Sequence, residues 1–209
     1  SLGYVYMTGS TGAGLDGNPH VGQNDIFLVK YNSSGARQWT LQTGSIADDV
    51  GYAVAVDGLD NLYITGSTAL GFDGSFVAGW KDVFLVKYNS SGNWQWTRLL
   101  GTIEDDIGYG VAVDGLGNVY VTGFTGLGLD GNTTNGLNDI FLAKYNSSGV
   151  KQWTQQLGTS LQDVGYAVAP DSLGNIYITG STGGGLDGNT NVGGLDIFVV
   201  KYDSSGNLQ

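Results

Sequence analysis

Acidic residues are the side chains of this sequence that are numerous enough to do chemistry. There are 19 Asp and Glu residues against eight Lys and Arg, with one histidine and no cysteine. Thiol catalysis and thiolate metal sites are therefore excluded, and His20, which follows Pro19 in a loop-like stretch, is expected to be solvated. Adjacent acids stand at Asp48-Asp49 and Asp105-Asp106, but the third such position is Gln162-Asp163, so paired-carboxylate hydrolysis has little support. We predict no catalytic residue.

Aspartate recurs at four positions that are spaced by 57 residues. These are Asp16/Asp73/Asp130/Asp187, Asp25/Asp82/Asp139/Asp196, Asp49/Asp106/Asp163 and Asp57/Asp114/Asp171. In one interpretation they are structural, because a short carboxylate accepts backbone N–H groups in tight turns. In the other, Asp16, Asn18 and Asp25 with their repeats bind calcium, which prefers oxygen ligands, although the spacing matches no EF-hand loop. Apart from this calcium ion, no cofactor is predicted.

A lysine recurs inside an apolar run of residues, at Lys30, Lys87, Lys144 and Lys201. A lysine that is buried between packed elements needs a carboxylate partner to offset the loss of hydration. We therefore predict structural ion pairs from Lys87 to Asp57 or Asp114, and from Lys144 to Asp114 or Asp171.

Aromatic side chains fall into two groups. Trp39, Trp96 and Trp153 recur with the repeat, whereas the aromatic residues Trp80, Trp94, Phe76 and Phe124 each occur in a single unit. The recurring group is expected to pack between elements, and the single ones are better placed for exposed contacts with a ligand. We predict ligand binding at Trp80 and Phe76, together with the recurring Asp16, Asp73, Asp130 and Asp187.

These positions are carried by a sequence unit that repeats along the whole chain. Tyr63-Ile64-Thr65-Gly66 returns 57 residues later as Tyr120-Val121-Thr122-Gly123. Each repeat period holds four strand-like runs, which we expect near 52–57, 62–66, 82–88 and 94–100, and again 57 residues later. Short turns such as Asp57–Asn61 make neighbouring strands antiparallel. Four antiparallel strands in a unit of this length are typical of a propeller blade, whereas a sandwich needs no such period. The predicted fold class is all-β, an arc of a β-propeller.

The repeat predicts how the chain is divided. Residues 1–209 form one propeller segment with units 1–57 (lacking the innermost strand A), 58–114, 115–171 and an incomplete 172–209. Strand A is the run at 52–57, and the outermost strand D holds Gln-Trp-Thr. One strand D and one strand A are missing from a fourth full unit, so we expect the rest of a longer chain, or further copies, to complete the ring.

The order of the phrases resembles a known family. The run D-x-GYAVAVDGLGN-x-Y-x-TG, followed by GLDG, DIFLVKYNSSG and QWT, is similar to the bacterial SBBP propeller repeat over essentially the whole chain. The resemblance implies seven blades and a bacterial, often secreted or surface-attached, setting. It carries no catalytic residues.

Composition narrows the class of partner. The net charge is −11 and the pI about 4.1, so the surface repels nucleic acid and anionic membranes. No apolar run approaches the length of a membrane span, so no membrane insertion is expected. The longest and most variable connection, Ser10–Asn24 in the first unit, marks the loop face as the binding face. We predict an extracellular or cell-surface scaffold or protein-binding module that is not an enzyme; a glycan-binding propeller with sites on the long-loop face is the alternative.

Overall fold

The computed structural model describes residues 3–71 and 77–209, and within these ranges the regular structure is almost entirely β-strand. Fourteen strands form four antiparallel sheets, in the orders β1-β2-β3, β4-β5-β6-β7, β8-β9-β10-β11 and β12-β13-β14 in the described ranges. Their bounds are β1 Val5–Thr11, β2 Asp25–Tyr31, β3 Arg37–Thr43, β4 Asp49–Val56, β5 Leu62–Thr68, β6 Asp82–Tyr88, β7 Trp94–Leu100, β8 Asp106–Val113, β9 Val119–Thr125, β10 Asp139–Tyr145, β11 Lys151–Leu157, β12 Asp163–Pro170, β13 Ile176–Thr182 and β14 Asp196–Tyr202. The prediction of an all-β propeller fold is confirmed.

Among residues 3–71 and 77–209, two three-residue 3-10 helices interrupt the loops, η1 (Leu129–Gly131) and η2 (Leu186–Gly188). No helix in the part of the chain that the structure describes is long and apolar enough to cross a membrane.

Strand A begins earlier than its sequence pattern indicates. The run expected over 52–57 is β4, which starts at Asp49 and ends at Val56. A β-bulge between Gly51 and Ala53 inserts Tyr52 as an extra residue, and β5 continues to pair on both sides of it. A residue larger than glycine would clash at position 51, because its Cβ would lie 2.5 Å from the hydroxyl oxygen of Thr8 on the preceding sheet.

The sheets are offset from the repeat units. Each sheet boundary falls after strand D, for example between Thr43 and Asp49, whereas the units drawn from the sequence end at Asp57 and Asp114. The 57-residue period matches the sheets, but those unit boundaries separate strand A from the sheet in which it pairs.

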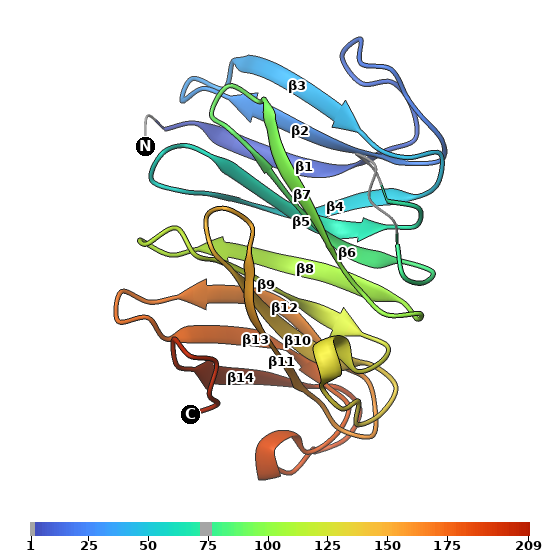
Figure 1. The fold of residues 1–209 in the computed structure, drawn as a ribbon, viewed down its shortest axis with the longest axis vertical. Coiled ribbons are helices and arrows are strands. Elements are labelled where there is room, and N and C mark those ends of the chain that lie inside the picture. The colour runs from blue at the N-terminus through green and yellow to red at the C-terminus, as the bar shows by residue number, and fades with distance from the viewer. Residues whose placement is uncertain (1–2, 72–76) are drawn as a thin grey trace.

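The sheets stack face to face, and the core lies between them (Figure 1). Strand C is buried on both faces, as in β6, where Phe84 and Leu85 are both inaccessible to solvent. The inner strand β8 packs against β4 and β5 of the preceding sheet and against β12 of the next. Burial of apolar side chains on both faces, at about 25 cal/mol per Å² of apolar area, therefore holds the stack together.

Figure 1 separates two ends of this stack. The short-turn end carries the β4–β5, β8–β9 and β12–β13 turns together with the β2–β3, β6–β7 and β10–β11 turns. The long-loop end carries the β1–β2, β5–β6, β9–β10 and β13–β14 loops and the β3–β4, β7–β8 and β11–β12 connections between sheets.

Candidate functional site

The recurring aspartates of the GLDG loops hold those loops onto strand D. Asp16 and Asp130 adopt a left-handed backbone (φ 54° and 52°), and the same conformation recurs at Asp187. The Asp130 carboxylate accepts the Thr154 hydroxyl at 2.5 Å and pairs with Lys151, as Asp16 does with Thr40 and Arg37. Burial raises the pKa of Asp130, but the Lys151 and Thr154 hydrogen bonds outweigh it and hold that pKa below its ordinary value.

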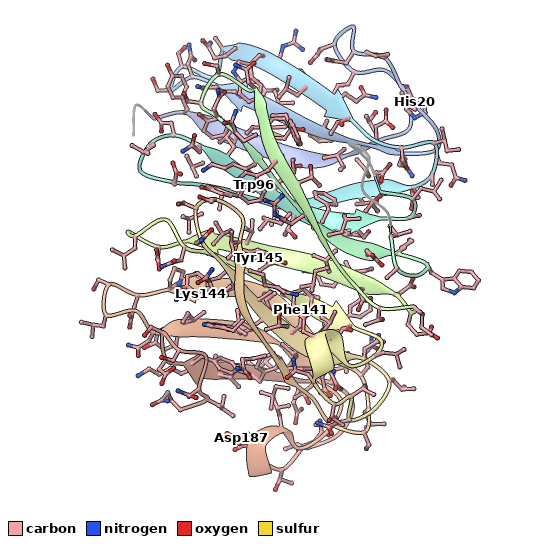
Figure 2. The ribbon with its side chains drawn as sticks, in the orientation of Figure 1. His20, Trp96, Phe141, Lys144, Tyr145 and Asp187 are labelled. Carbon is pink, nitrogen blue, oxygen red and sulfur yellow. The ribbon has the colours of Figure 1, made fainter. Side chains whose placement is uncertain are left out.

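Two of the predicted ligand residues, Asp73 and Phe76, lie outside the described residues. Asp187 lies in η2 and is labelled in Figure 2. His20 lies at the long-loop end, where its Nε2 is 3.1 Å from the carbonyl oxygen of Gln23.

The three residues of the calcium hypothesis have separate partners. Asn18 donates its side-chain amide to the carbonyls of Leu15 and Thr40 (2.9 and 3.2 Å), and Asp25 accepts hydrogen bonds from Val21 and Gln42. In the described ranges, no group of three or more His, Cys, Asp or Glu side chains gathers at a point that could hold a metal ion. Calcium binding at Asp16, Asn18 and Asp25 stays a prediction.

Buried aspartates face one another across each sheet boundary, which sequence reasoning missed. The pairs are Asp25/Asp49, Asp82/Asp106 and Asp139/Asp163, and every member is at most 2% exposed. The boundary glycine shows their proximity, because a Cβ on Gly44 would lie 2.5 Å from Asp25 Oδ1 and 3.1 Å from Asp49 Oδ2. The signal in the sequence is this glycine, which recurs at Gly101 and Gly158.

In the middle pair, both carboxyl groups are short of donors. Oδ1 of Asp82 is buried without a hydrogen-bond partner. The Thr125 hydroxyl, which is paired opposite Asp106, hydrogen-bonds the Asp106 carboxyl and lowers its pKa, but it also donates to the carbonyl of Leu127 at 2.7 Å, so its one proton serves two acceptors. Burial raises the pKa of both carboxyls, and the charge of Asp82 raises that of Asp106 further, against hydrogen bonds that lower it.

The predicted lysine ion pairs are wrong. Lys87 donates from Nζ to the backbone carbonyl of Ser147 in the next sheet at 3.0 Å, and Lys144 does the same to Ser204. Lys87 also lies 5.0 Å from the ring centroid of Tyr63, within cation–π range. No ion pair in the part of the chain that the structure describes joins these lysines to Asp57 or Asp114.

The reason is that the aspartate is already used within its own turn. Oδ1 of Asp57 accepts the backbone N–H groups of Leu59 and Asn61, both at 2.9 Å, and Oδ2 accepts the Asn61 side-chain amide and the Tyr63 hydroxyl. Lys144 lies toward the short-turn end in Figure 2, where the carbonyls of the neighbouring Asn-Ser-Ser-Gly-type turn are within its reach. A carbonyl acceptor thus replaces the expected carboxylate.

The predicted contact residue Trp80 lines a groove of about 400 Å³ at the long-loop end, between the second and third sheets. The groove is also lined by Phe124, Glu104, Asp105, Gly126, Leu127, Gly136, Leu137 and Asn138. Trp80 is 78% exposed, whereas Phe124 is 8% exposed and packs against Tyr109 at 6.0 Å between ring centroids. Sequence reasoning identified both aromatics but not Glu104 as their neighbour.

A second cavity, of about 410 Å³, lies on the fourth sheet against β14. Leu186, Asp187, Asn189 and Lys201 line it. In the third sheet the corresponding Leu129, Asp130 and Asn132 contact Gln156 and Thr154 of β11, so the cavity occupies the place of a strand D.

The chain is similar in sequence to two known proteins and in fold to a solved structure. The chain is 29% identical over 75% of its length to an uncharacterised WD repeat-containing protein of Acanthamoeba polyphaga mimivirus, and 28% identical over 97% to a Caulobacter vibrioides protein named regulatory protein FlaEY. It spans only 14% and 22% of those two proteins. A crystal structure of a protein of unknown function from Bacteroides caccae shares the fold, with a TM-score of 0.50 and 11% identity over 98% of this chain and 56% of the other.

One family matches three times along the chain. The β-propeller repeat called SBBP covers residues 38–73, 95–126 and 152–187. Each match starts in strand D and runs through strands A and B of the next sheet, so the matches follow the period of the sheets. From these three matches and the stacked antiparallel sheets, the chain belongs to the SBBP β-propeller repeat family.

Proposed function

We propose that this chain is a non-catalytic protein-binding module that presents its long-loop end to a partner. The observation that carries the proposal is the contrast between the two ends. At the short-turn end, recurring side chains such as Asp57 and Asp114 make the same hydrogen bonds in successive sheets. At the long-loop end the loops differ in sequence, so the exposed side chains there, such as Trp80 and Leu137 (78% and 68%), differ from sheet to sheet. The exposed leucine of the short turns, such as Leu59, is instead the same residue in each turn.

A rigid scaffold with variable loops is a common arrangement for recognition. One of the relatives is named a regulatory protein, which is compatible with a binding role, but this chain spans only 22% of it. We extend the proposal to an extracellular or cell-surface location, which follows from the resemblance to secreted and surface-attached repeats, and to a protein as the partner.

A selection experiment tests the proposal. The purified chain is used to select binders from a displayed peptide library, and hydrogen exchange then locates the bound peptide. We expect protection at the long-loop end, in the β5–β6 and β9–β10 loops. Protection confined to the short-turn end, or no selectable peptide, would contradict the proposal.

Glycan binding is the second candidate. An exposed Trp80 beside the carboxylates Glu104 and Asp105 and the amide of Asn138 is a combination that also stacks on and hydrogen-bonds a sugar. The other loops do not repeat Trp80 or Glu104, so such a propeller would have one site rather than one in each blade. A glycan array run beside the peptide selection separates the two candidates.

A further inference from the structure

Three side chains that depart from the repeat meet in the groove between the second and third sheets. They are Trp80, Glu104 and Phe124. The corresponding residues elsewhere are Gln23, Leu137 and Gly194 for Trp80, Ala47 and Leu161 for Glu104, and Ser10, Ser67 and Ser181 for Phe124. A scaffold role alone does not need these departures, because the other sheets stack without them.

The backbone on both sides of this groove is held in place. Lys81 and Asp105 form a parallel β-bridge, and the N–H of Asp106 donates to the carbonyl of Lys81 at 2.8 Å. Trp80 and Glu104 each directly precede a bridged residue, so the indole and the carboxylate are carried by adjoining segments. Gly126 on the other wall lies so close that its Cβ would be 2.7 Å from that of Glu104. The groove is therefore preorganised.

The charged side chains that line the groove, Glu104 and Asp105, are both negative. Glu104 and Asp105 are both exposed, and in the described ranges neither takes part in an ion pair. Lys81, the nearest cation in sequence, pairs instead with Asp48 at 3.6 Å. Two carboxylates beside an exposed indole favour a cation, and the net charge of −11 favours the approach of a basic partner.

We propose that the groove binds the guanidinium group of an arginine side chain presented by a partner protein. The planar guanidinium stacks on the Trp80 indole while its N–H groups donate to Glu104 or Asp105. Leu127 and Leu137 line the groove beside it and offer apolar surface to the methylene stem. About 400 Å³ accommodates one or two side chains, which is the scale of an anchor in a protein interface.

The inference rests on the proposed protein-binding function, and its test uses a defined probe. The blocked peptide acetyl-Gly-Arg-Gly-amide is titrated into the chain while the indole N–H signals are followed by NMR. We expect the Trp80 signal to shift and saturate at ~1–10 mM, the range for a single anchoring side chain. The signal of Trp94, whose Nε1 donates to Thr97, serves as the internal control and stays fixed.

A neutral ligand and repeat-derived variants supply the matched controls. The citrulline peptide, which has nearly the shape of arginine without its charge, should bind about two- to fivefold more weakly. Trp80→Gln and Glu104→Ala install residues that the first unit already carries, so the fold is retained, and each should weaken arginine binding by about two- to fivefold. Trp94→Lys, with the residue found at 151, should leave it unchanged.

Equal binding of the arginine and citrulline peptides, or arginine binding that survives Trp80→Gln, overturns the inference. If library-selected peptides protect the long-loop end but need no arginine, the inference fails while the protein-binding function stands. If the groove takes a neutral oligosaccharide instead, both fail in favour of the glycan candidate.

Discussion

Asp82 and Asp106 are buried on the two sides of the boundary between the second and third sheets, close enough for the charge of Asp82 to raise the pKa of Asp106. Each is buried, and Oδ1 of Asp82 has no donor. The repulsion between two buried carboxylates is relieved when one of them holds a proton. The pair is therefore a place where proton binding and the stability of the stack are linked.

We expect this pair to make stability fall as the pH rises. The folded-state pKa of Asp106 is raised above the unfolded value of about 3.9, mainly by burial, so the folded chain binds the extra proton. The stabilising contribution is complete below that value and is lost as the pH rises through the raised pKa. Asp57, Asp114 and Asp130, whose pKa values are lowered, act in the opposite direction and lose stability in acid.

Asp106→Asn isolates the effect of the pair. The amide carries no charge, like the protonated carboxyl, so the free energy of unfolding of the variant should exceed that of the parent by about 1–3 kcal/mol at pH 7 and by little or nothing at pH 4. Urea unfolding at the two pH values measures this difference. A difference in stability that is the same at both pH values would show that the pair takes up no extra proton in the folded chain.

Gly101→Ala should destabilise the boundary that this pair occupies. A Cβ at Gly101 would lie 2.4 Å from both Cγ and Oδ1 of Asp82, which is buried and cannot move away freely. The expected loss is about 1–3 kcal/mol by chemical denaturation. Gly115→Ala is the control, because no atom lies within 4 Å of its added Cβ and its φ is not positive. Equal losses of stability for the two variants would mean that the contact between the added Cβ and Asp82 does not destabilise the boundary.

Lys87 and Asp114 should be energetically independent. Lys87 donates to the Ser147 carbonyl, whereas the Asp114 carboxylate accepts the backbone N–H groups of Leu116 and Asn118 in its own turn. In a double-mutant cycle with Lys87→Met and Asp114→Asn, we expect each single change to cost about 0.5–1.5 kcal/mol and the coupling to stay within about 0.5 kcal/mol. A coupling energy well above that value would show that Lys87 and Asp114 do form an ion pair.

Adding a strand D to the fourth sheet should stabilise the chain. Gln209 donates its N–H to the carbonyl of Lys201, in the register that leads Gln152 into Trp153. Extension after Gln209 by Trp-Thr-Gln-Gln-Leu, the residues found at 153–157, should fill the cavity by β14 and give Asp187 a hydroxyl donor. We expect the free energy of unfolding, measured by thermal unfolding, to rise by about 2–4 kcal/mol. An extension by Gly-Ser-Gly-Ser-Gly serves as the control, and equal gains would contradict the prediction.

Calcium separates the two interpretations of the GLDG loops. Asp130→Asn weakens the Thr154 and Lys151 bonds, so we expect a loss of about 0.5–1.5 kcal/mol in thermal unfolding, of the same size with and without calcium. Calorimetric titration of the parent chain checks for binding directly. A heat of calcium binding that is seen with the parent chain and lost in Asp130→Asn would establish the metal site and contradict the purely structural interpretation.

Local patterns in the sequence determined the strands, their order and the antiparallel turns. The 57-residue period, the Asp57–Asn61 turn and the apolar run of β6 each act within one unit, so their structural result is visible in the residues themselves. The alignment of strands within a sheet follows from the same short turns. The repeat also showed Trp80 and Phe124 to be exceptional.

The contacts between sheets were decided only by the tertiary structure. The pairing of Asp82 with Asp106, the choice of Ser147 over Asp114 by Lys87, and the meeting of Trp80 with Glu104 all depend on how one sheet is placed on the next. A repeat fixes the period of a chain but not the distance or rotation between stacked sheets. Those quantities follow from the packing of whole faces, because the energy of burial is shared among many side chains and favours no single pair.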